Sequence, residues 1–446
     1  MRIKWIFIFL FCYIISYNLA FADNQTLKVG YWDELSEESQ KILKEYPTLK
    51  IIGGDMTADT TKDLVGQFLT KDFTYDVFPL FSIQYDIQPL IKKGYLADLS
   101  NNDIICENIN KMRPDIVSMV SKGSKIYALP YGLETEFLSI RPKVWKNAGF
   151  HLDEIPDTFD AFLDFLDIWS KAPVPGYCVI NQFDETMYTE STYSKWLLEL
   201  LFENYLMQYR YSGKLIEFDN PSLKEKMEHC ITTGKTLYQV EKTPNNGYAL
   251  FESGCSGIRV ENLVSLRMDK EQPRLVTAYL WMVAVNAEST IKDLAMNYAA
   301  NVLDKDKYTS VLLFQEPYSV INPYYAKALE EYESAIKGIE EQLTNINLAA
   351  EIKQKLQNTL EEYNEEFAFF INEESEYYVT DVQVKEFYNR VDGIYIETPG
   401  PLSIGSEYGP MLNQLIASYA AGLLSTDQII SKLDEICWMI QMEEGL

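Results

Sequence analysis

The sequence contains very few histidines and far fewer basic than acidic residues. It has 2 histidines, and 39 lysines and arginines stand against 66 aspartates and glutamates. Zinc hydrolases, Ser-His-Asp triads and histidine-based acid–base catalysis depend on histidine, so this scarcity weighs against them. The formal charge of −27 would repel phosphate backbones and anionic lipid, so we expect no nucleic-acid partner. The same charge tolerates a neutral or cationic ligand better than an anionic one.

Paired cysteines are also lacking. Beyond Cys12, the cysteines are far apart and include no C-x-x-C pair: Cys106, Cys178, Cys230, Cys255 and Cys437. This spacing indicates neither a zinc site nor a dense disulfide framework, and we expect no metal and no cofactor. One disulfide is compatible with an oxidising compartment, but buried thiols are the preferred interpretation.

Long hydrophobic runs are confined to the N-terminus. Arg2 and Lys4 precede an apolar stretch from Trp5 to Tyr17, and Ala20-Phe21-Ala22 has the small-x-small form of a cleavage site. This layout predicts a secretory signal peptide over residues 1–22, with an uncleaved N-terminal anchor as the alternative. We therefore expect an exported protein, located in the periplasm, or extracellular or at the cell surface if the host lacks an outer membrane.

Strand and helix patterns alternate near the start of the remaining chain. Three strand-like runs are separated by two helical patterns, at 27–32, 34–46, 49–52, 61–69 and 75–81. Strand, helix, strand, helix, strand over so short a stretch is typical of a parallel α/β unit. A chain of this length normally divides into two or more domains.

The later segments are mostly helical. Aromatic stripes over 159–169 and 193–205 have helical spacing, which favours a role in the core. A strand pattern follows at 275–285, and a helical one at 290–303. Within 327–371 apolar residues recur three and four apart in two series, which predicts an antiparallel helical hairpin with its glutamates on a solvated face. We interpret this hairpin as structural decoration, with partner binding as the alternative.

Several motifs occur in the order found in one known family. They are Tyr75-Asp76-Val77 followed by Gly94-Tyr95-Leu96-Ala97-Asp98-Leu99, then Lys125-Ile126-Tyr127-Ala128-Leu129-Pro130-Tyr131-Gly132, Lys143-Val144-Trp145-Lys146-Asn147-Ala148-Gly149-Phe150 and Ile155-Pro156-Asp157-Thr158-Phe159. Together they resemble the extracellular solute-binding proteins of ABC transporters, in the sugar-binding family 1 typified by maltose-binding protein. The resemblance covers most of residues 27–300. The segment 248–257 fits only loosely, and the hairpin is unusual for the family.

The resemblance implies an α/β, two-lobed periplasmic-binding-protein-like (type II) fold with hinge strands. Lobe 1 is expected to comprise 23–132 and 277–320, and lobe 2 to comprise 133–276 and 321–446, including the hairpin 327–371. The lobes of such proteins close around a small-molecule ligand, and the closed form docks on ABC permease membrane subunits. The resemblance also implies a monomer that is not an enzyme.

Ligands of α/β sheets bind beyond the carboxyl ends of strands, which selects the expected site. From the first lobe and the hinge-like segment 128–132, the expected ligand-binding residues are Tyr31, Trp32, Asp33, Phe81, Ser82, Gln84, Tyr131 and Glu134. From the second lobe and the return strand they are Asn181, Asp184, Tyr279 and Trp281. Aromatic faces suit a pyranose or a cationic ring, and carboxylates and amides hold hydroxyls or charge. The two tryptophans fit core or surface packing as well.

Other functions remain open at this point. A secreted enzyme on the same scaffold, a thiaminase-like transferase or a glycosidase, needs a nucleophilic cysteine or a carboxylate pair. The segment Leu133-Glu134-Thr135-Glu136 contains no cysteine, and no motif singles out a pair. A binding protein could instead serve a sensor kinase, or bind a cationic ligand such as thiamine or a polyamine. A sugar or oligosaccharide is preferred on the resemblance alone.

Overall fold

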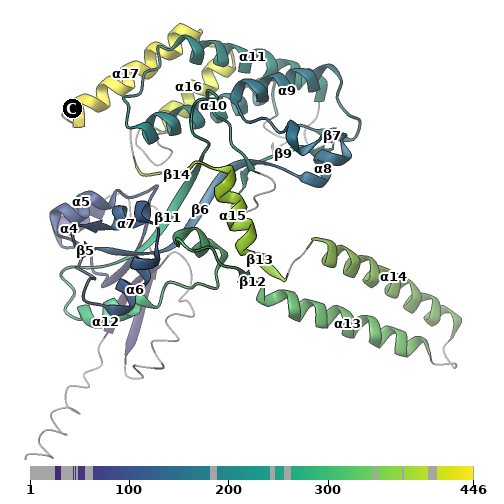
Figure 1. Ribbon diagram of the computed structural model, residues 1–446, viewed down its shortest axis with the longest axis horizontal. Coiled ribbons are helices and arrows are strands. Elements are labelled where there is room, and N and C mark those ends of the chain that lie inside the picture. Colours follow the sequence, from purple (N-terminus) through teal and green to yellow (C-terminus); the bar gives the residue numbers. More distant parts are fainter. Residues whose placement is uncertain are drawn as a thin grey trace, which may run out of the picture.

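The computed structural model describes most of the chain after the predicted signal peptide. The described residues are 26–31, 44, 46, 49–55, 64–180, 188–241, 247–255, 263–344, 349–373, 376–399 and 409–444. The predicted signal peptide and nearly all of the predicted helix 34–46 lie outside them. The described residues form two bodies joined by strands, with a helical hairpin to one side (Figure 1).

The main sheet begins with the three predicted parallel strands. Its first strands are β1 (Thr26–Tyr31), β2 (Lys50–Asp55) and β3 (Val77–Phe81), with β1 paired in parallel to both of the others. Next in the sheet is β11 (Leu275–Val285), which runs antiparallel to β3 and to β6 (Ala128–Ile140). The α/β unit predicted from the sequence is therefore confirmed, as is the strand predicted at 275–285.

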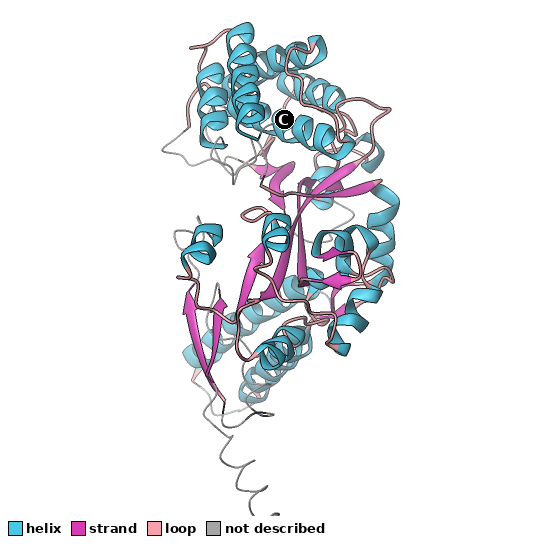
Figure 2. Ribbon diagram, turned by 90° about the vertical axis from the view of Figure 1, so that its left-hand side faces the viewer, coloured by secondary structure: helices cyan, strands magenta, loops and turns pink. Residues whose placement is uncertain are grey.

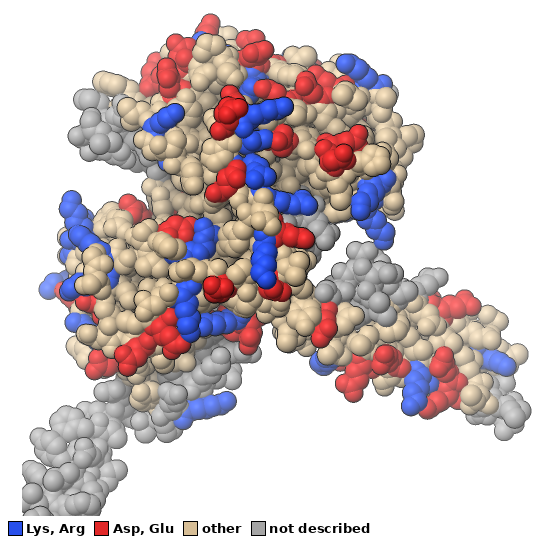
Figure 3. Space-filling view, viewed as in Figure 1, with Lys and Arg blue, Asp and Glu red and all other residues tan. Residues whose placement is uncertain are grey.

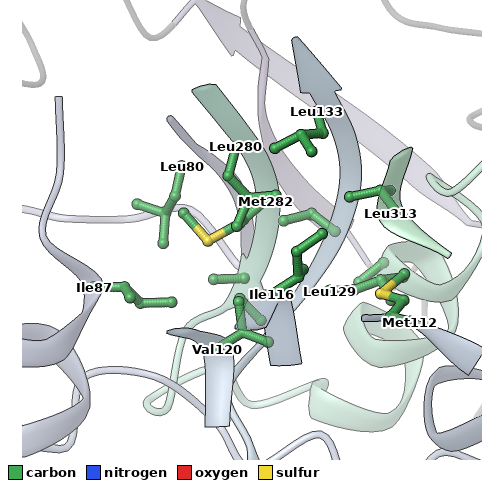
Figure 4. Close-up of a cluster of buried hydrophobic side chains, with 14 of the residues drawn as sticks. Leu80, Ile87, Met112, Ile116, Val120, Leu129, Leu133, Leu280, Met282 and Leu313 are labelled. Carbon is green, nitrogen blue, oxygen red and sulfur yellow. The ribbon is translucent and has the colours of Figure 1, made fainter. Parts of the chain in front are cut away.

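Helices and loops pack on this sheet to form the first hydrophobic core. The helices are α4 (Leu64–Thr70), α5 (Ile87–Lys93), α6 (Asp103–Lys111), α7 (Pro114–Val120) and α12 (Lys292–Ala300), with a short 3₁₀ helix at Tyr308–Leu313. Figure 4 shows side chains of strands and helices converging between these layers, including Leu80, Ile116, Leu129 and Met282. Each of these four is essentially inaccessible to solvent.

The second body is mainly helical and has its own core. Its helices are α8 (Pro142–Asn147), α9 (Phe159–Lys171), α10 (Thr192–Ser212), α11 (Pro221–Glu241), α16 (Gly409–Ala420) and α17 (Thr426–Glu444). Short strands β7 (Tyr177–Cys178), β8 (Tyr248–Ala249), β9 (Phe251–Cys255) and β10 (Leu263–Val264) complete it. The aromatic stripes of α9 and α10 are buried, as expected, with Phe162, Trp169 and Phe202 among the core residues. Thr158 caps α9, because its side chain accepts a hydrogen bond from the Ala161 N–H at 3.2 Å.

Strands run from one body into the other (Figure 2). Along the single strand β6, Leu129 and Leu133 belong to the first core whereas Leu138 and Ile140 belong to the second. The strand β14 (Gly393–Ile396) pairs in parallel with the beginning of β11. The chain therefore has the two-lobed α/β fold with hinge strands that the motifs imply.

The predicted helical hairpin is present as α13 (Pro323–Leu343) and α14 (Ala350–Glu373). Its two helices pack through contacts such as that of Tyr332 with Phe367, whose ring centroids are 5.7 Å apart. None of their described side chains is buried, and acidic side chains lie along the projecting hairpin (Figure 3). No helix in the described ranges is both long enough and apolar enough to span a bilayer.

The hairpin returns the chain to the first lobe, which differs from the expected assignment of 321–446 to lobe 2. It is inserted between β12 (Val320–Ile321) and β13 (Tyr377–Val379), which pair antiparallel. After β13, Val384 and Phe387 of α15 (Asp381–Arg390) pack in the first core. The expected boundary at 321 was wrong, because the chain leaves the first lobe at β12, forms the hairpin and comes back to the first lobe at β13. Of the described residues after 321, those from α16 onward belong to the second core.

Candidate functional site

A cavity of about 340 Å³ lies between the hinge strands and α10. Its walls are formed by β6, β10, β11, β14, α10 and α16. The apolar wall residues belong to both cores, with Phe137 and Val276 from the first and Leu200, Leu266 and Ile416 from the second. The cavity is therefore at the junction of the lobes, and its volume is in the range of small-molecule sites.

The strand side of the cavity combines an aromatic ring and a carboxylate. Alternate residues of a strand share a face, so Glu136 lies on the same face of β6 as Glu134, which pairs with Tyr279 of β11. The Tyr279 hydroxyl donates a hydrogen bond to the Glu136 carboxylate. Burial and the adjacent negative charge raise the pKa of Tyr279, so the hydroxyl stays protonated. Glu136 is thus held in place by a neutral donor.

The helix side adds two glutamates one turn apart. Residues four apart on a helix are neighbours on its surface, so Glu199 and Glu203 of α10 face the cavity together. Further along the helix, the Arg210 guanidinium is 3.7 Å from the Glu397 carboxylate. Glu397 is nearly buried, and its backbone N–H donates to the Ala278 carbonyl at 2.9 Å, which holds it against β11.

Glu203 has the most perturbed carboxyl group of the cavity. Enclosure by the surrounding protein, reinforced by the carboxylates of Glu136, Glu199 and Glu397, raises the pKa of Glu203 to about 8. Its side chain is nevertheless exposed, since it faces solvent within the cavity. Within the described ranges neither Glu136 nor Glu203 forms an ion pair. The site therefore holds acidic groups that no described basic residue neutralises.

An aromatic cluster extends the same strand face toward the first lobe. The rings of Phe81 and Trp281 are stacked with centroids 4.1 Å apart, and Tyr279 meets Phe81 edge-on at 5.8 Å. Tyr131 lies 6.5 Å from Trp281. Four of the sequence-predicted site residues are thus brought together, and half-buried Glu134 lies opposite Tyr279 in the ladder. Of the residues predicted, Tyr279 itself lines the cavity.

Two predicted residues do not face this site. Ser82 is fully buried, and its hydroxyl accepts the Leu280 N–H at 2.9 Å while its own N–H donates to the Leu280 carbonyl. Its polar groups are therefore engaged with the β11 backbone, which makes it a framework residue. Gln84 is exposed in the turn after β3 and is not part of the cavity wall. Other predicted positions lie outside the described residues, namely Trp32, Asp33, Asn181, Asp184 and the side chain of Tyr31.

The carboxylates that line the cavity were not predicted from the sequence. The missed ionisable residues are Glu136, Glu199, Glu203, Arg210, Tyr395 and Glu397. Glu136 could have been found, because it follows Glu134 by two residues on a strand. The two glutamates of α10 interrupt a stripe that is mostly core, and nothing local distinguishes them from ordinary surface charges. In the described part of the chain, no group of three or more His, Cys, Asp or Glu side chains could hold a metal ion.

The fold and the cavity together define a two-lobed α/β protein with a cavity at the junction of its lobes. No protein-family model matches the chain, and no curated protein does. Solved structures are similar in fold. A protein from work on xylan utilization by Caldanaerobius polysaccharolyticus has a TM-score of 0.53 and 13% identity, over 92% of this chain and 99% of its own.

Two further solved structures are similar in fold to this chain. An ABC transporter solute-binding protein from Agrobacterium vitis with bound D-mannitol has a TM-score of 0.51 and 15% identity, over 94% of this chain and 99% of its own. A cyclic alpha-maltosyl-1,6-maltose binding protein from Arthrobacter globiformis has a TM-score of 0.52 and 14% identity, over 93% and 98%. The fold of this chain therefore resembles that of these three proteins over nearly its whole length.

Proposed function

We propose that the protein is the extracytoplasmic solute-binding component of an ABC importer. It captures a small polar solute between its lobes, and a sugar or oligosaccharide is the favoured class. The observation that carries the proposal is the cavity at the lobe junction, walled by aromatic rings and carboxylates. Aromatic faces cover the apolar face of a sugar ring, and carboxylates accept hydrogen bonds from hydroxyls.

The similar structures support the same class of ligand. The Agrobacterium vitis protein holds D-mannitol, and the Arthrobacter globiformis protein is named for a cyclic maltosyl-maltose. At 14–15% identity these two structures support the fold. Their ligands suggest which solutes to test first in a binding screen. The partner is then a pair of permease membrane subunits, and the protein is exported, in line with the signal peptide predicted at 1–22.

The architecture suits a closing mechanism. β6, β11 and β14 are the described strands that join the lobes, so small changes in their backbone angles would rotate one lobe against the other. A solute that contacts both lobes stabilises the closed form by its differential affinity for that form. The aromatic cluster of Phe81, Tyr131 and Trp281 lies where the first lobe would approach such a solute.

The proposal is tested by a thermal-shift screen of the protein without residues 1–22, using sugars, oligosaccharides, sugar alcohols, thiamine and polyamines. A solute that binds only the folded protein raises the melting temperature with concentration, by about 2.7 kcal/mol of stabilisation at 100 times Kd. Hits are then measured by isothermal titration calorimetry, and the solute is examined for chemical change. Released product would identify a hydrolase or transferase instead. A screen without any hit would contradict the proposal.

The Trp281→Ala variant tests where the solute binds. Trp281 does not line the cavity itself, but its ring stacks on Phe81, which meets the cavity-lining Tyr279 edge-on. If the solute reaches this aromatic cluster from the cavity, removing the indole should lower its affinity at least tenfold. Trp438→Ala is the matched control, because Trp438 is a 61% exposed tryptophan on α17 that belongs neither to the cavity wall nor to the aromatic cluster. Unchanged binding by Trp281→Ala would place the solute elsewhere.

A further inference from the structure

We infer that the solute carries a positively charged nitrogen, as an amino sugar or a polyamine does. This inference rests on the proposed function and names the class of ligand more narrowly. Its basis is the charge of the cavity wall, in which four carboxyl groups are accompanied by one guanidinium among the described residues. The carboxyl groups are those of Glu136, Glu199, Glu203 and Glu397, and the guanidinium is that of Arg210.

The cations near the cavity are already engaged. Arg210 is 3.7 Å from Glu397, and Lys195, which lies outside the wall, is 3.4 Å from Glu199. Glu136 receives a hydrogen bond from the neutral Tyr279 hydroxyl, which does not cancel its charge. No described cation is paired with Glu136 or Glu203, so a cationic solute can neutralise Glu136 and favour the charged form of Glu203. A neutral sugar would leave the repulsion between these carboxylates in place, whereas a cation would relieve it.

The shape and lining of the cavity favour an organic cation. The carboxylates come from β6, α10 and the residue after β14, and they do not converge on a metal-binding point. Trp196, Tyr279 and Tyr395 line the same cavity. Aromatic faces attract ammonium groups by about 0.5–2 kcal/mol, and they also cover the hydrocarbon part of the same molecule. An extended amine contacts several carboxylates at once, which a single metal ion in this cavity would not.

The inference predicts how binding depends on pH. Glu203 faces the other ionisable wall groups of every lining element: Glu136, Tyr279, Glu199, Arg210, Tyr395 and Glu397. The pKa of Glu203 is about 8, so this group is mostly protonated at pH 6 and loses its proton as the pH rises. Affinity for a permanently protonated amine should therefore increase between pH 6 and pH 8, with release of a proton on binding. In Glu203→Gln this increase should disappear.

The test is isothermal titration calorimetry with matched probes at pH 6.5. The probes are β-1,4-linked tetrasaccharides of glucosamine, N-acetylglucosamine and glucose, with spermidine as an amine without a sugar ring. We expect an amine probe to bind about tenfold more tightly than either neutral tetrasaccharide, and Glu203→Gln to remove most of this difference. Spermidine serves for the pH series, because it stays protonated throughout. Glu225→Gln, an exposed glutamate of α11 outside the cavity, is the control variant.

The possible results separate this inference from the proposed function. A neutral tetrasaccharide that binds as tightly as both amines, with no effect of Glu203→Gln, overturns the inference and leaves the solute-binding function in place. Failure of every probe, together with an empty sugar screen, overturns both. Each variant is first checked for its melting temperature, and Glu136→Gln provides a second removal of charge if Glu203→Gln does not fold.

Discussion

At the scale of single residues, the cavity contains groups that weaken the free protein. Burial and like charges raise the pKa of Glu203 from 4.5 to about 8. The folded form then binds more protons than the unfolded chain between these values. Stability contributed by this carboxyl group is therefore present at low pH and is lost as the pH rises toward 8. Such unfavourable electrostatics are typical of binding and catalytic sites.

Replacing this carboxyl group should stabilise the protein without solute. We expect Glu203→Gln to increase the free energy of unfolding at pH 8 on the order of 1 kcal/mol, since solvent in the cavity screens much of the full effect. At pH 4 the two proteins should be equally stable, because Glu203 is then protonated in both states. Urea unfolding at both pH values checks this. Equal stability at pH 8 would show that the carboxyl group is not perturbed.

At the scale of elements, an ion pair fixes β14 to β11. Arg274 precedes β11 and Asp392 precedes β14. Arg274 donates three hydrogen bonds to the Asp392 carboxylate, from Nη2 at 3.0 Å, from Nε at 3.2 Å and from its backbone N–H at 2.8 Å. The Arg274 donors lower the pKa of Asp392 from 3.8 to about 2. This contact sets the register of β14, and thereby carries Tyr395 and Glu397 to the cavity.

Asp392→Asn should weaken this junction at neutral pH. We expect a loss of about 1 kcal/mol in the free energy of unfolding, a modest value because both side chains are partly exposed. The Asp392 contribution is present above its ordinary pKa and is lost as the pH falls toward 2, so the two proteins should converge there. Thermal unfolding between pH 2 and pH 7 measures the difference. A difference that persists at pH 2 would indicate a cause other than the ion pair.

The helical hairpin should be dispensable for folding. Ile321 pairs with Tyr377 at its base, so a two-residue Asn-Gly turn in place of 323–375 can join β12 to β13. Because no described side chain of α13 or α14 is buried, deletion removes little of either core. We expect the melting temperature to change by only a few degrees and solute binding to stay the same. A large loss of stability in circular dichroism would show that the hairpin supports the lobes.

At the scale of the whole molecule, two cores joined by β6, β11 and β14 should allow rotation of one lobe against the other. We expect a saturating solute to reduce the radius of gyration measured by small-angle X-ray scattering. Trp281→Ala should show no such decrease at the same concentration of solute, while Trp438→Ala should match the unsubstituted protein. An unchanged radius with bound solute would mean that binding does not require closure.

The local pattern of the sequence was enough to predict several elements of this fold. Alternating strand and helix patterns identified β1, β2, β3 and β11, and heptad-like spacing identified the hairpin. These features depend on the periodicity of a few neighbouring residues, which is set by backbone geometry. The aromatic residues Phe81 and Tyr131 were selected because ligands bind beyond the carboxyl ends of strands, and Trp281 because it lies in the strand that returns to the first lobe.

The tertiary structure alone decided which charges face the cavity. Glu136, Glu203 and Glu397 come from three elements far apart in the chain, and their proximity arises from the packing of α10 and β14 against the hinge strands. The same packing returned α15 to the first lobe, against the expectation from chain order. Periodicity tells which face of an element is apolar, but only the three-dimensional arrangement determines which elements share a wall, and the pKa of Glu203 depends on that arrangement.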